Sequence, residues 1–128
     1  MSRPVVLDSS ALLCLLIGEP GAERVAKALP SAVIGAVNLA EVVTKLRERG
    51  LSVEEVEEVL GGLHLDVRPL TTAQAYATGH LQPASRALGL SLGDRACLAL
   101  AAELGAVALT ADQAWTGVEA GGEIEVIR

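Results

Sequence analysis

The chain has 128 residues, 51% hydrophobic and 20% charged, which is enough apolar material for the core of one domain and too few charges for disorder. Acidic residues outnumber basic ones by 16 to 10, so the net charge is −6, and the aromatic residues are one Trp, one Tyr and no Phe. A broad basic groove for nucleic acid and a surface of aromatic rings that stack on bases are therefore excluded. A polyanionic ligand would have to be held by something other than net charge.

The first half of the chain alternates predicted strands and helices. An apolar, β-branched run over residues 4–7 predicts a strand, and the pattern that follows predicts helices over 11–17 and 22–29 and a strand over 32–35. Asn38 is expected to cap a helix that runs to Arg49. A capping-box pattern at Ser52 predicts one further helix, which ends at Gly61.

The second half continues the alternation. We expect a weaker strand over 65–70, a helix over 71–88 that breaks at Pro83, an apolar helix over 95–104 opened by Asp94, and strands over 106–109 and 124–127. Strands separated by helices predict a parallel sheet of about five strands with helices on both faces, that is, a three-layer α/β/α fold in a single domain over residues 1–128. In such sheets, ligand sites collect beyond the carboxyl ends of the strands.

Two features bear on the compartment. Cys14 and Cys97 match no zinc-binding spacing, so we interpret them as buried thiols in a reducing environment. The longest apolar run, Ala11 to Ile17, is far shorter than the ~20 residues that span a bilayer, and no cleavage site for a signal peptide follows it. We expect a cytoplasmic protein without a membrane anchor.

The acidic residues carry the functional signal. Asp8 and Asp112 directly follow predicted strands, Asp94 opens a helix, and Glu41 lies in the first turns of another. Each has an ordinary explanation: Asp8 or Asp94 as a helix cap, Asp112 as a turn residue, and Glu41 as a partner of Lys45. Together these explanations weaken, because both strand-end aspartates should meet at one edge of the sheet. Carboxylates that lie close together are tolerated when they take up protons or share a cation.

The ligand types select the cation. All the candidate groups are oxygen donors, which suit Mg²⁺ or Mn²⁺ better than zinc. Such ions bind phosphate oxygens and activate water, so an acidic protein that holds them can still act on a polyanion. The residues alone thus suggest a metal-dependent phosphodiesterase.

Four blocks of the sequence, in this order, resemble the signature blocks of PIN domains, and their spacing resembles the VapC-type toxins of bacterial toxin–antitoxin pairs. The blocks are Val6–Leu13, Val37–Val42, Leu92–Ala101 and Leu109–Trp115. The resemblance covers essentially the whole chain. It implies a five-stranded parallel sheet and a Mg²⁺- or Mn²⁺-dependent endoribonuclease that hydrolyses RNA phosphodiester bonds with a metal-activated water.

The resemblance also implies roles for individual residues. Asp8 and Asp94 would be the main metal ligands, Glu41 a ligand or the group that orients the attacking water, and Asp112 a fourth acid that acts through water. Supporting polar positions that hydrogen-bond these carboxylates would be Ser9, Asn38 and Thr110.

Other polar residues carry weaker predictions. Arg95 and Arg86 lie near Asp94 in the sequence and are candidate phosphate contacts, although solvated helix positions or salt bridges explain them as well. His64 and His80 have no acidic or nucleophilic neighbour at a recognisable spacing, so we expect no catalytic role for either.

The helix over 11–17 raises the question of partners, because a helix that is apolar all round is not a surface helix. It is either enclosed within the fold or in contact with another chain. The resemblance favours contact with another chain, in a homodimer whose groove is occupied by a cognate antitoxin, one of whose cationic side chains enters the acidic cluster.

Other functions fit less well. A response-regulator receiver needs paired acids after the first strand, where Asp8 is followed by two serines, and a haloacid dehalogenase-type phosphotransferase needs Asp where Ser10 stands. A nucleotide-binding module needs a glycine-rich loop at this place. A PIN-like domain that binds RNA or protein without cleaving is the remaining alternative.

Overall fold

The computed structural model describes residues 3–82, 88–116 and 122–128. At its centre is a five-stranded sheet in the order β3-β2-β1-β4-β5, in which every neighbouring pair is parallel. The strands are β1 (Val5–Leu7), β2 (Ala32–Gly35), β3 (Asp66–Arg68), β4 (Val107–Thr110) and β5 (Glu123–Val126). The prediction of a parallel sheet of about five strands is therefore confirmed.

The central strand β1 is buried on both faces, as the middle of a parallel sheet should be. Its side chains alternate: Val5 and Leu7 belong to one apolar cluster, and Val6 belongs to the other. The register places Leu7 beside Ile34 of β2 and Leu109 of β4. Whatever follows Leu7 in the sequence therefore emerges in the middle of the sheet's carboxyl edge.

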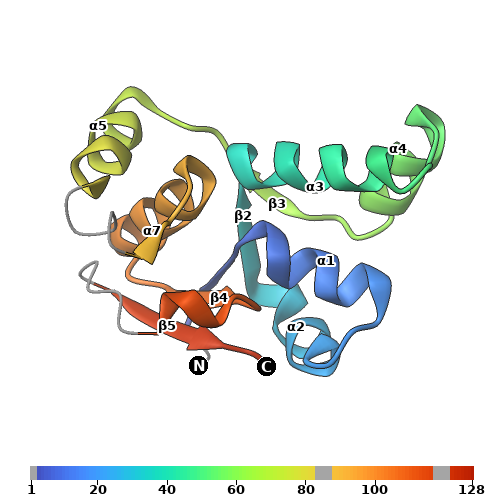
Figure 1. Ribbon diagram of the computed structural model, residues 1–128, viewed down its shortest axis with the longest axis horizontal. Helices are drawn as coiled ribbons and strands as arrows, with labels where there is room; N and C mark the ends of the chain where they lie inside the picture. Colours follow the sequence, from blue (N-terminus) through green and yellow to red (C-terminus); the bar gives the residue numbers. More distant parts are fainter. Residues whose placement is uncertain (1–2, 83–87, 117–121) are drawn as a thin grey trace.

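Helices cover both faces and complete the three layers (Figure 1). One apolar cluster joins the sheet to residues of α1, α2, α3 and α4, and the other joins it to α7 and the buried Trp115. The helices are α1 (Ser9–Ile17), α2 (Ala22–Ala28), α3 (Ala36–Glu48), α4 (Val53–Gly61), α5 (Thr72–His80) and α7 (Leu92–Leu104), with 3₁₀ turns η1 (Leu29–Ser31) and η3 (Gln113–Trp115). The prediction of an α/β/α fold is confirmed.

The all-apolar helix α1 is largely enclosed by its own chain. It packs against α2 and α3, and Ala11, Leu12 and Cys14 are fully buried. Ile17, at the end of the helix, is 38% exposed. Enclosure within the fold thus accounts for most of the apolar character of this helix, and contact with a second chain stays a prediction.

Helix starts and ends differ from expectation in three places. Gly35, not Asn38, is the N-cap of α3, because the Asn38 side chain is turned inward and binds α7. Ser91, not Asp94, is the N-cap of α7, and Asp94 is at position N3, the last residue of a capping box. The helix expected to extend from residue 71 to 88 ends at His80, while Pro83 lies outside the described residues.

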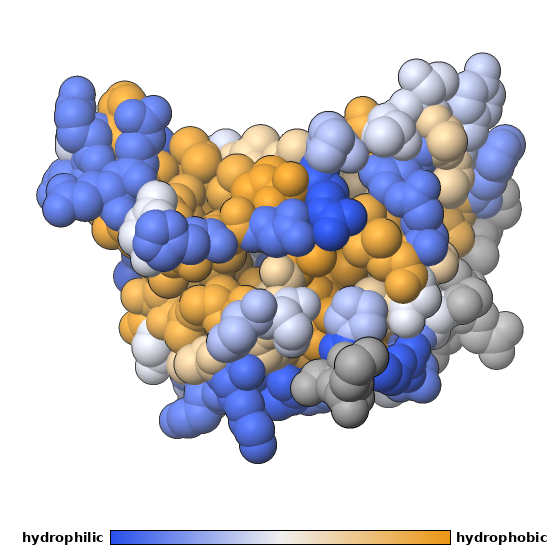
Figure 2. Space-filling view, turned by 180° about the vertical axis from the view of Figure 1, so that it is seen from behind, coloured by the Kyte–Doolittle hydropathy of each residue, from blue (hydrophilic) through white to orange (hydrophobic). Residues whose placement is uncertain are grey.

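Both cysteines are free and buried, as expected. No helix among the residues that the structure describes is long and apolar enough to cross a membrane. On the face seen in Figure 2, hydrophobic residues reach the surface and hydrophilic residues interrupt them.

Candidate metal centre

The strand order places a reversal of chain direction at the carboxyl edge of the sheet, between β1 and β4. From β1 the chain proceeds to β2 and β3 on one side, and it returns through α5 and α7 to β4 on the other. The place where the direction reverses is where α/β sheets hold ligands. Asp8 directly follows β1, and Thr110 is the last residue of β4.

The Asp8 carboxylate is buried and strongly hydrogen-bonded. The residue is 2% exposed, and its Oδ1 accepts the backbone N–H of Ala11 at 2.8 Å, which caps helix α1. Ser10 Oγ lies 2.8 Å and 2.9 Å from the two carboxylate oxygens, and Thr110 Oγ1 donates to Oδ2. Asp8 is therefore the N-cap of α1, as the ordinary explanation predicted. Its hydrogen bond with the Thr110 hydroxyl of β4 is not part of the cap and points to a further role.

Two hydroxyl groups connect the ends of β1 and β4 around this carboxylate. Ser10 Oγ accepts the backbone N–H of Ala111 at 2.9 Å, and Thr110 Oγ1 accepts that of Asp112 at 3.0 Å. The predicted support from Thr110 is thus present. Ser10, which the sequence did not single out, supports Asp8, whereas Ser9 donates no hydrogen bond to it among the described residues.

Burial raises the pKa of Asp8 from 3.8 to about 6. The hydrogen bonds from Thr110, Ala11 and Ser10 act in the opposite direction, and the negative charge of Asp94 raises the pKa further. A carboxylate that is desolvated and close to a like charge is stabilised by a proton or a cation.

Asn38 and Glu41 of α3 form the opposite wall, against the start of α7. Asn38 Nδ2 donates to Glu41 Oε1 at 3.1 Å and to the carbonyl oxygen of Gly93 at 3.0 Å. A methyl group on Gly93 would overlap the Glu41 carboxylate. Gly93 is thus a second residue that sequence reasoning missed: glycine is needed here for close approach rather than for a special backbone angle. Glu41 does not pair with Lys45, whose Nζ lies 3.4 Å from Glu48 Oε1 instead.

The Asp94 carboxylate faces the same region. Its Oδ2 accepts the backbone N–H of Ser91 at 2.9 Å, and its charge raises the pKa of Asp8. Burial, followed by the charges of Asp8, Asp94 and Glu41, raises the pKa of the Cys97 thiol on the next turn of α7. The charges of the three acids therefore all act on the beginning of α7.

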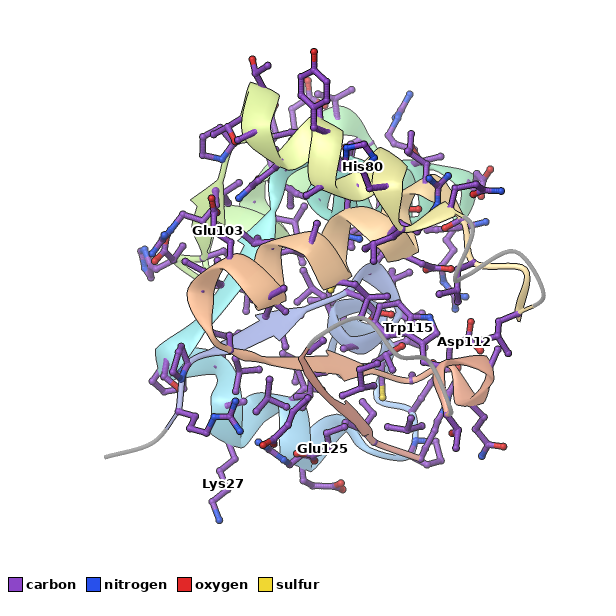
Figure 3. All side chains as sticks on the ribbon, turned by 90° about the vertical axis from the view of Figure 1, so that its left-hand side faces the viewer. Lys27, His80, Glu103, Asp112, Trp115 and Glu125 are labelled. Carbon is purple, nitrogen blue, oxygen red and sulfur yellow. The ribbon has the colours of Figure 1, made fainter. Side chains whose placement is uncertain are left out.

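Asp112 has a different environment. Its side chain is exposed, and Oδ1 accepts the backbone N–H of Ala114 at 2.9 Å, so that it caps η3. Asp112 and the buried Trp115 lie together just beyond the end of β4 (Figure 3). These contacts fit the interpretation of Asp112 as an ordinary turn residue. A role for Asp112 in binding metal through water stays a prediction.

The cationic candidates are placed differently from the acids. Arg95 Nη1 donates to the carbonyl oxygen of Thr78 at 3.3 Å, which ties α7 to α5. Arg86 lies outside the described residues. His64 and His80 are exposed, and His80 makes a ring contact with Tyr76.

The donor set suits a hard divalent cation. Within the described part of the chain, no three Asp, Glu, His or Cys side chains lie close enough to hold one ion among them. Mg²⁺ is commonly bound by one or two carboxylates while it keeps several waters. A buried carboxylate that feels the charge of a second one, with oxygen donors only, fits this mode of binding, with Asp8 and Asp94 as the residues that would hold the ion.

The fold is that of chains from solved toxin–antitoxin complexes. A chain of the DNA-bound VapBC complex from Salmonella typhimurium matches with a TM-score of 0.76 and 20% identity, covering 99% of this chain and 100% of that one. A chain of a toxin–antitoxin complex from Klebsiella pneumoniae matches with a TM-score of 0.75 and 16% identity, covering 97% and 98%. One from VapBC2 of Rickettsia felis, bound to a promoter DNA fragment, has a TM-score of 0.74 and 13% identity, covering 95% and 97%.

Comparison with curated proteins gave no match. The family model of the PIN domain matches residues 5–120, a stretch that runs from the first residue of β1 past η3 and includes all four acids. The chain therefore belongs to the PIN domain family.

Proposed function

We propose that this protein is a Mg²⁺- or Mn²⁺-dependent endoribonuclease and the toxin of a type II toxin–antitoxin pair. Membership of the PIN family and the likeness in fold to chains of toxin–antitoxin complexes support this assignment. The observation that carries it is the buried Asp8 carboxylate at the carboxyl edge of the sheet, whose charge is opposed by burial and by Asp94.

In this proposal the chain supplies three carboxylates in fixed positions, those of Asp8, Glu41 and Asp94, which we call the acidic frame. Asp8 is held in one orientation by the N-terminus of α1 and by the hydroxyls of Ser10 and Thr110, and Asp94 faces it from α7. Glu41, which accepts a hydrogen bond from Asn38, is the group to which we assign the proton of the attacking water. A bound Mg²⁺ or Mn²⁺ would neutralise phosphate charge and lower the pKa of a water molecule. The bound ion would offset locally the net charge of −6, which otherwise opposes RNA binding.

The proposed partners follow from the same comparisons. We assign a cognate antitoxin to this chain because the matched structures come from toxin–antitoxin complexes. An apolar groove of about 520 Å³ between α3, α4 and β3, with Val53 and Val67 exposed at it, supports binding of an apolar peptide segment. We also propose a homodimer that acts on RNA in the cytoplasm. Light scattering of the purified chain is expected to give twice the chain mass, and a monomer would contradict the dimer.

Cleavage of RNA tests the central proposal. Purified protein is expected to cut tRNA or another structured RNA in the presence of Mn²⁺, and the activity is expected to disappear with a chelator and in Asp8→Asn. Tight RNA binding without cleavage under any divalent ion would instead support a non-catalytic PIN-like binding module. Full activity of Asp94→Asn would contradict the assignment of the metal site.

A further inference from the structure

A pocket beside the acidic frame contains a positive charge that the proposed chemistry does not use. It lies between the start of α1 and the middle of α3, and its volume is about 320 Å³, within the range of small-ligand sites. It continues from the frame because two of the same elements line it. The lining residues are Ser9, Ser10, Leu13, Glu41, Thr44 and Lys45.

Lys45 is the single cation among the described residues that line this pocket. It lies four residues after Glu41 on α3, which places both side chains on one face of the helix, with Glu41 toward the metal site and Lys45 one turn further along. A polyanion whose reacting phosphate lies at the acidic frame would therefore meet Lys45 with its adjacent phosphate.

The present partner of Lys45 leaves the amine available. Lys45 Nζ is 3.4 Å from Glu48 Oε1, and both side chains are 61% exposed, so the pair is solvated and weak. Thr44 Oγ1 donates its proton to the carbonyl oxygen of Ala40 at 3.0 Å and is not free to donate to a ligand oxygen. Lys45 is thus the residue in this pocket suited to bind a phosphate.

We propose that this pocket is the subsite for the RNA phosphate next to the scissile one, and that Lys45 binds its charge. The inference rests on the proposed ribonuclease function and adds a residue that positions the substrate. Leu13 gives the pocket an apolar wall, and the Ser9 hydroxyl, without a hydrogen-bond partner in the described part of the chain, can bond to a ribose or phosphate oxygen.

The test uses the only two lysines of the chain as a matched pair. Lys27, on α2, extends outward on a side of the molecule away from Asp112 (Figure 3). Binding of a short fluorescein-labelled single-stranded RNA to the full chain is measured by fluorescence anisotropy with a fixed concentration of Ca²⁺ in place of Mn²⁺, over a series of KCl concentrations. Lys45→Gln is expected to weaken binding and to reduce the slope of log K against log salt by about 0.7, the value for one lost phosphate contact on a single strand. Lys27→Gln is expected to leave the slope unchanged, and Lys45→Arg is expected to restore it.

A second pair of variants removes the competing ion pair. Glu48→Gln removes the weak ion pair with Lys45, so it is expected to tighten RNA binding more in the otherwise wild-type chain than in a Lys45→Gln background. In cleavage with Mn²⁺, Lys45→Gln is expected to raise KM and to leave kcat unchanged, as for a group that contributes equally to ground-state and transition-state binding.

The results separate this inference from the proposed function. If the chain cleaves RNA but Lys45→Gln and Lys27→Gln have equal effects on KM and on the salt slope, the subsite is wrong and the nuclease stands. If RNA binding depends on Lys45 as described but no cleavage occurs, the nuclease is wrong, and Lys45 stands as a contact for an RNA phosphate but not as part of a subsite beside a scissile bond. Absence of RNA binding and of cleavage in the wild type would overturn both.

Discussion

The ends of β1 and β4 carry aspartates that the sequence presents as equivalents, and the structure gives them opposite environments. Asp8 is 2% exposed and accepts hydrogen bonds from α1 and β4, whereas Asp112 is exposed and caps one short 3₁₀ turn. Helix α1 begins immediately after Asp8 and covers it, whereas Asp112 precedes only the short 3₁₀ turn η3 and is exposed. A position at the end of a strand brings an acid to the right edge; the segment that follows decides whether its charge is buried.

This difference separates two kinds of contribution to a metal site. A buried carboxylate held by several donors is fixed in direction and has a raised pKa, and both properties favour direct binding of a cation. An exposed carboxylate with a single backbone donor is less fixed in direction, and it is suited to act on an ion through a water molecule. The predictions that follow compare the two ends.

The largest contrast is expected in RNA cleavage. Asp8→Asn keeps a cap acceptor for α1 but removes the charge, so it should lower the cleavage rate with Mn²⁺ by roughly 10²- to 10³-fold. Asp112→Asn should lower it by about tenfold or less, as expected for an outer-shell group. Rates are measured on one RNA under single-turnover conditions. Equal losses in the two variants would remove the distinction between the two ends.

The second contrast concerns stability and pH in the absence of divalent ions. Because the folded-state pKa of Asp8, about 6, is above the unfolded value of 3.8, the folded protein binds more protons than the unfolded one in this window. Its free energy of unfolding should therefore fall as pH rises through the window, by up to about 3 kcal/mol from this residue. Asp8→Asn should be more stable than wild type at neutral pH by up to that amount, and the gap should close toward pH 3.8.

Urea unfolding in EDTA at a series of pH values measures this gap. Asp112→Asn is the control, because its side chain is exposed and Asn caps equally well; its unfolding free energy should change by less than about 0.5 kcal/mol. If the difference in unfolding free energy between Asp8→Asn and wild type did not vary with pH, burial would not be raising the pKa of Asp8.

The third contrast lies within one pair of neighbours. Ser10→Ala removes a donor to the Asp8 carboxylate, so it should weaken Mn²⁺ binding about 10- to 100-fold in a calorimetric titration. Ser9→Ala, one residue earlier, should leave Mn²⁺ affinity unchanged. A larger loss of Mn²⁺ affinity in Ser9→Ala than in Ser10→Ala would support Ser9, the residue predicted from the sequence, and would contradict the role of the Ser10 hydrogen bonds.

The smallest effect is expected at Gly93, on the wall facing Asp8. In Gly93→Ala the added methyl displaces the flexible end of Glu41 rather than backbone, so the fold should persist while the RNA cleavage rate falls by about tenfold. Gly79→Ala in α5 is the control, since no atom lies within 4 Å of its new methyl group; it should gain up to about 1 kcal/mol of stability with unchanged cleavage. Unchanged cleavage in Gly93→Ala would mean that the position of Glu41 does not matter.

Features set by local pattern could be predicted from the sequence. Alternation of short apolar runs with helices predicts the parallel sheet, and the capping box at Ser52 is present as expected. The positions of Asp8 and Thr110 at the carboxyl edge follow from the strands alone.

Features set by distant partners could not be predicted. Asn is a residue type that often caps helices, but the side-chain amide of Asn38 donates to the carbonyl oxygen of Gly93, 55 residues away. The choice of Ser10 over Ser9 depends on which side chain faces β4, and the exposure of Asp112 depends on the path of the chain after the sheet. In each case the deciding contact joins segments that no local pattern connects.

The central claim, that Asp8 and Asp94 hold a divalent ion, is tested most directly by anomalous diffraction from crystals soaked in Mn²⁺. The account predicts one strong manganese peak between these two carboxylates, absent from crystals of Asp8→Asn and retained in Asp112→Asn. Manganese bound elsewhere in the wild-type protein, with the space between the two carboxylates filled by solvent alone, would contradict it.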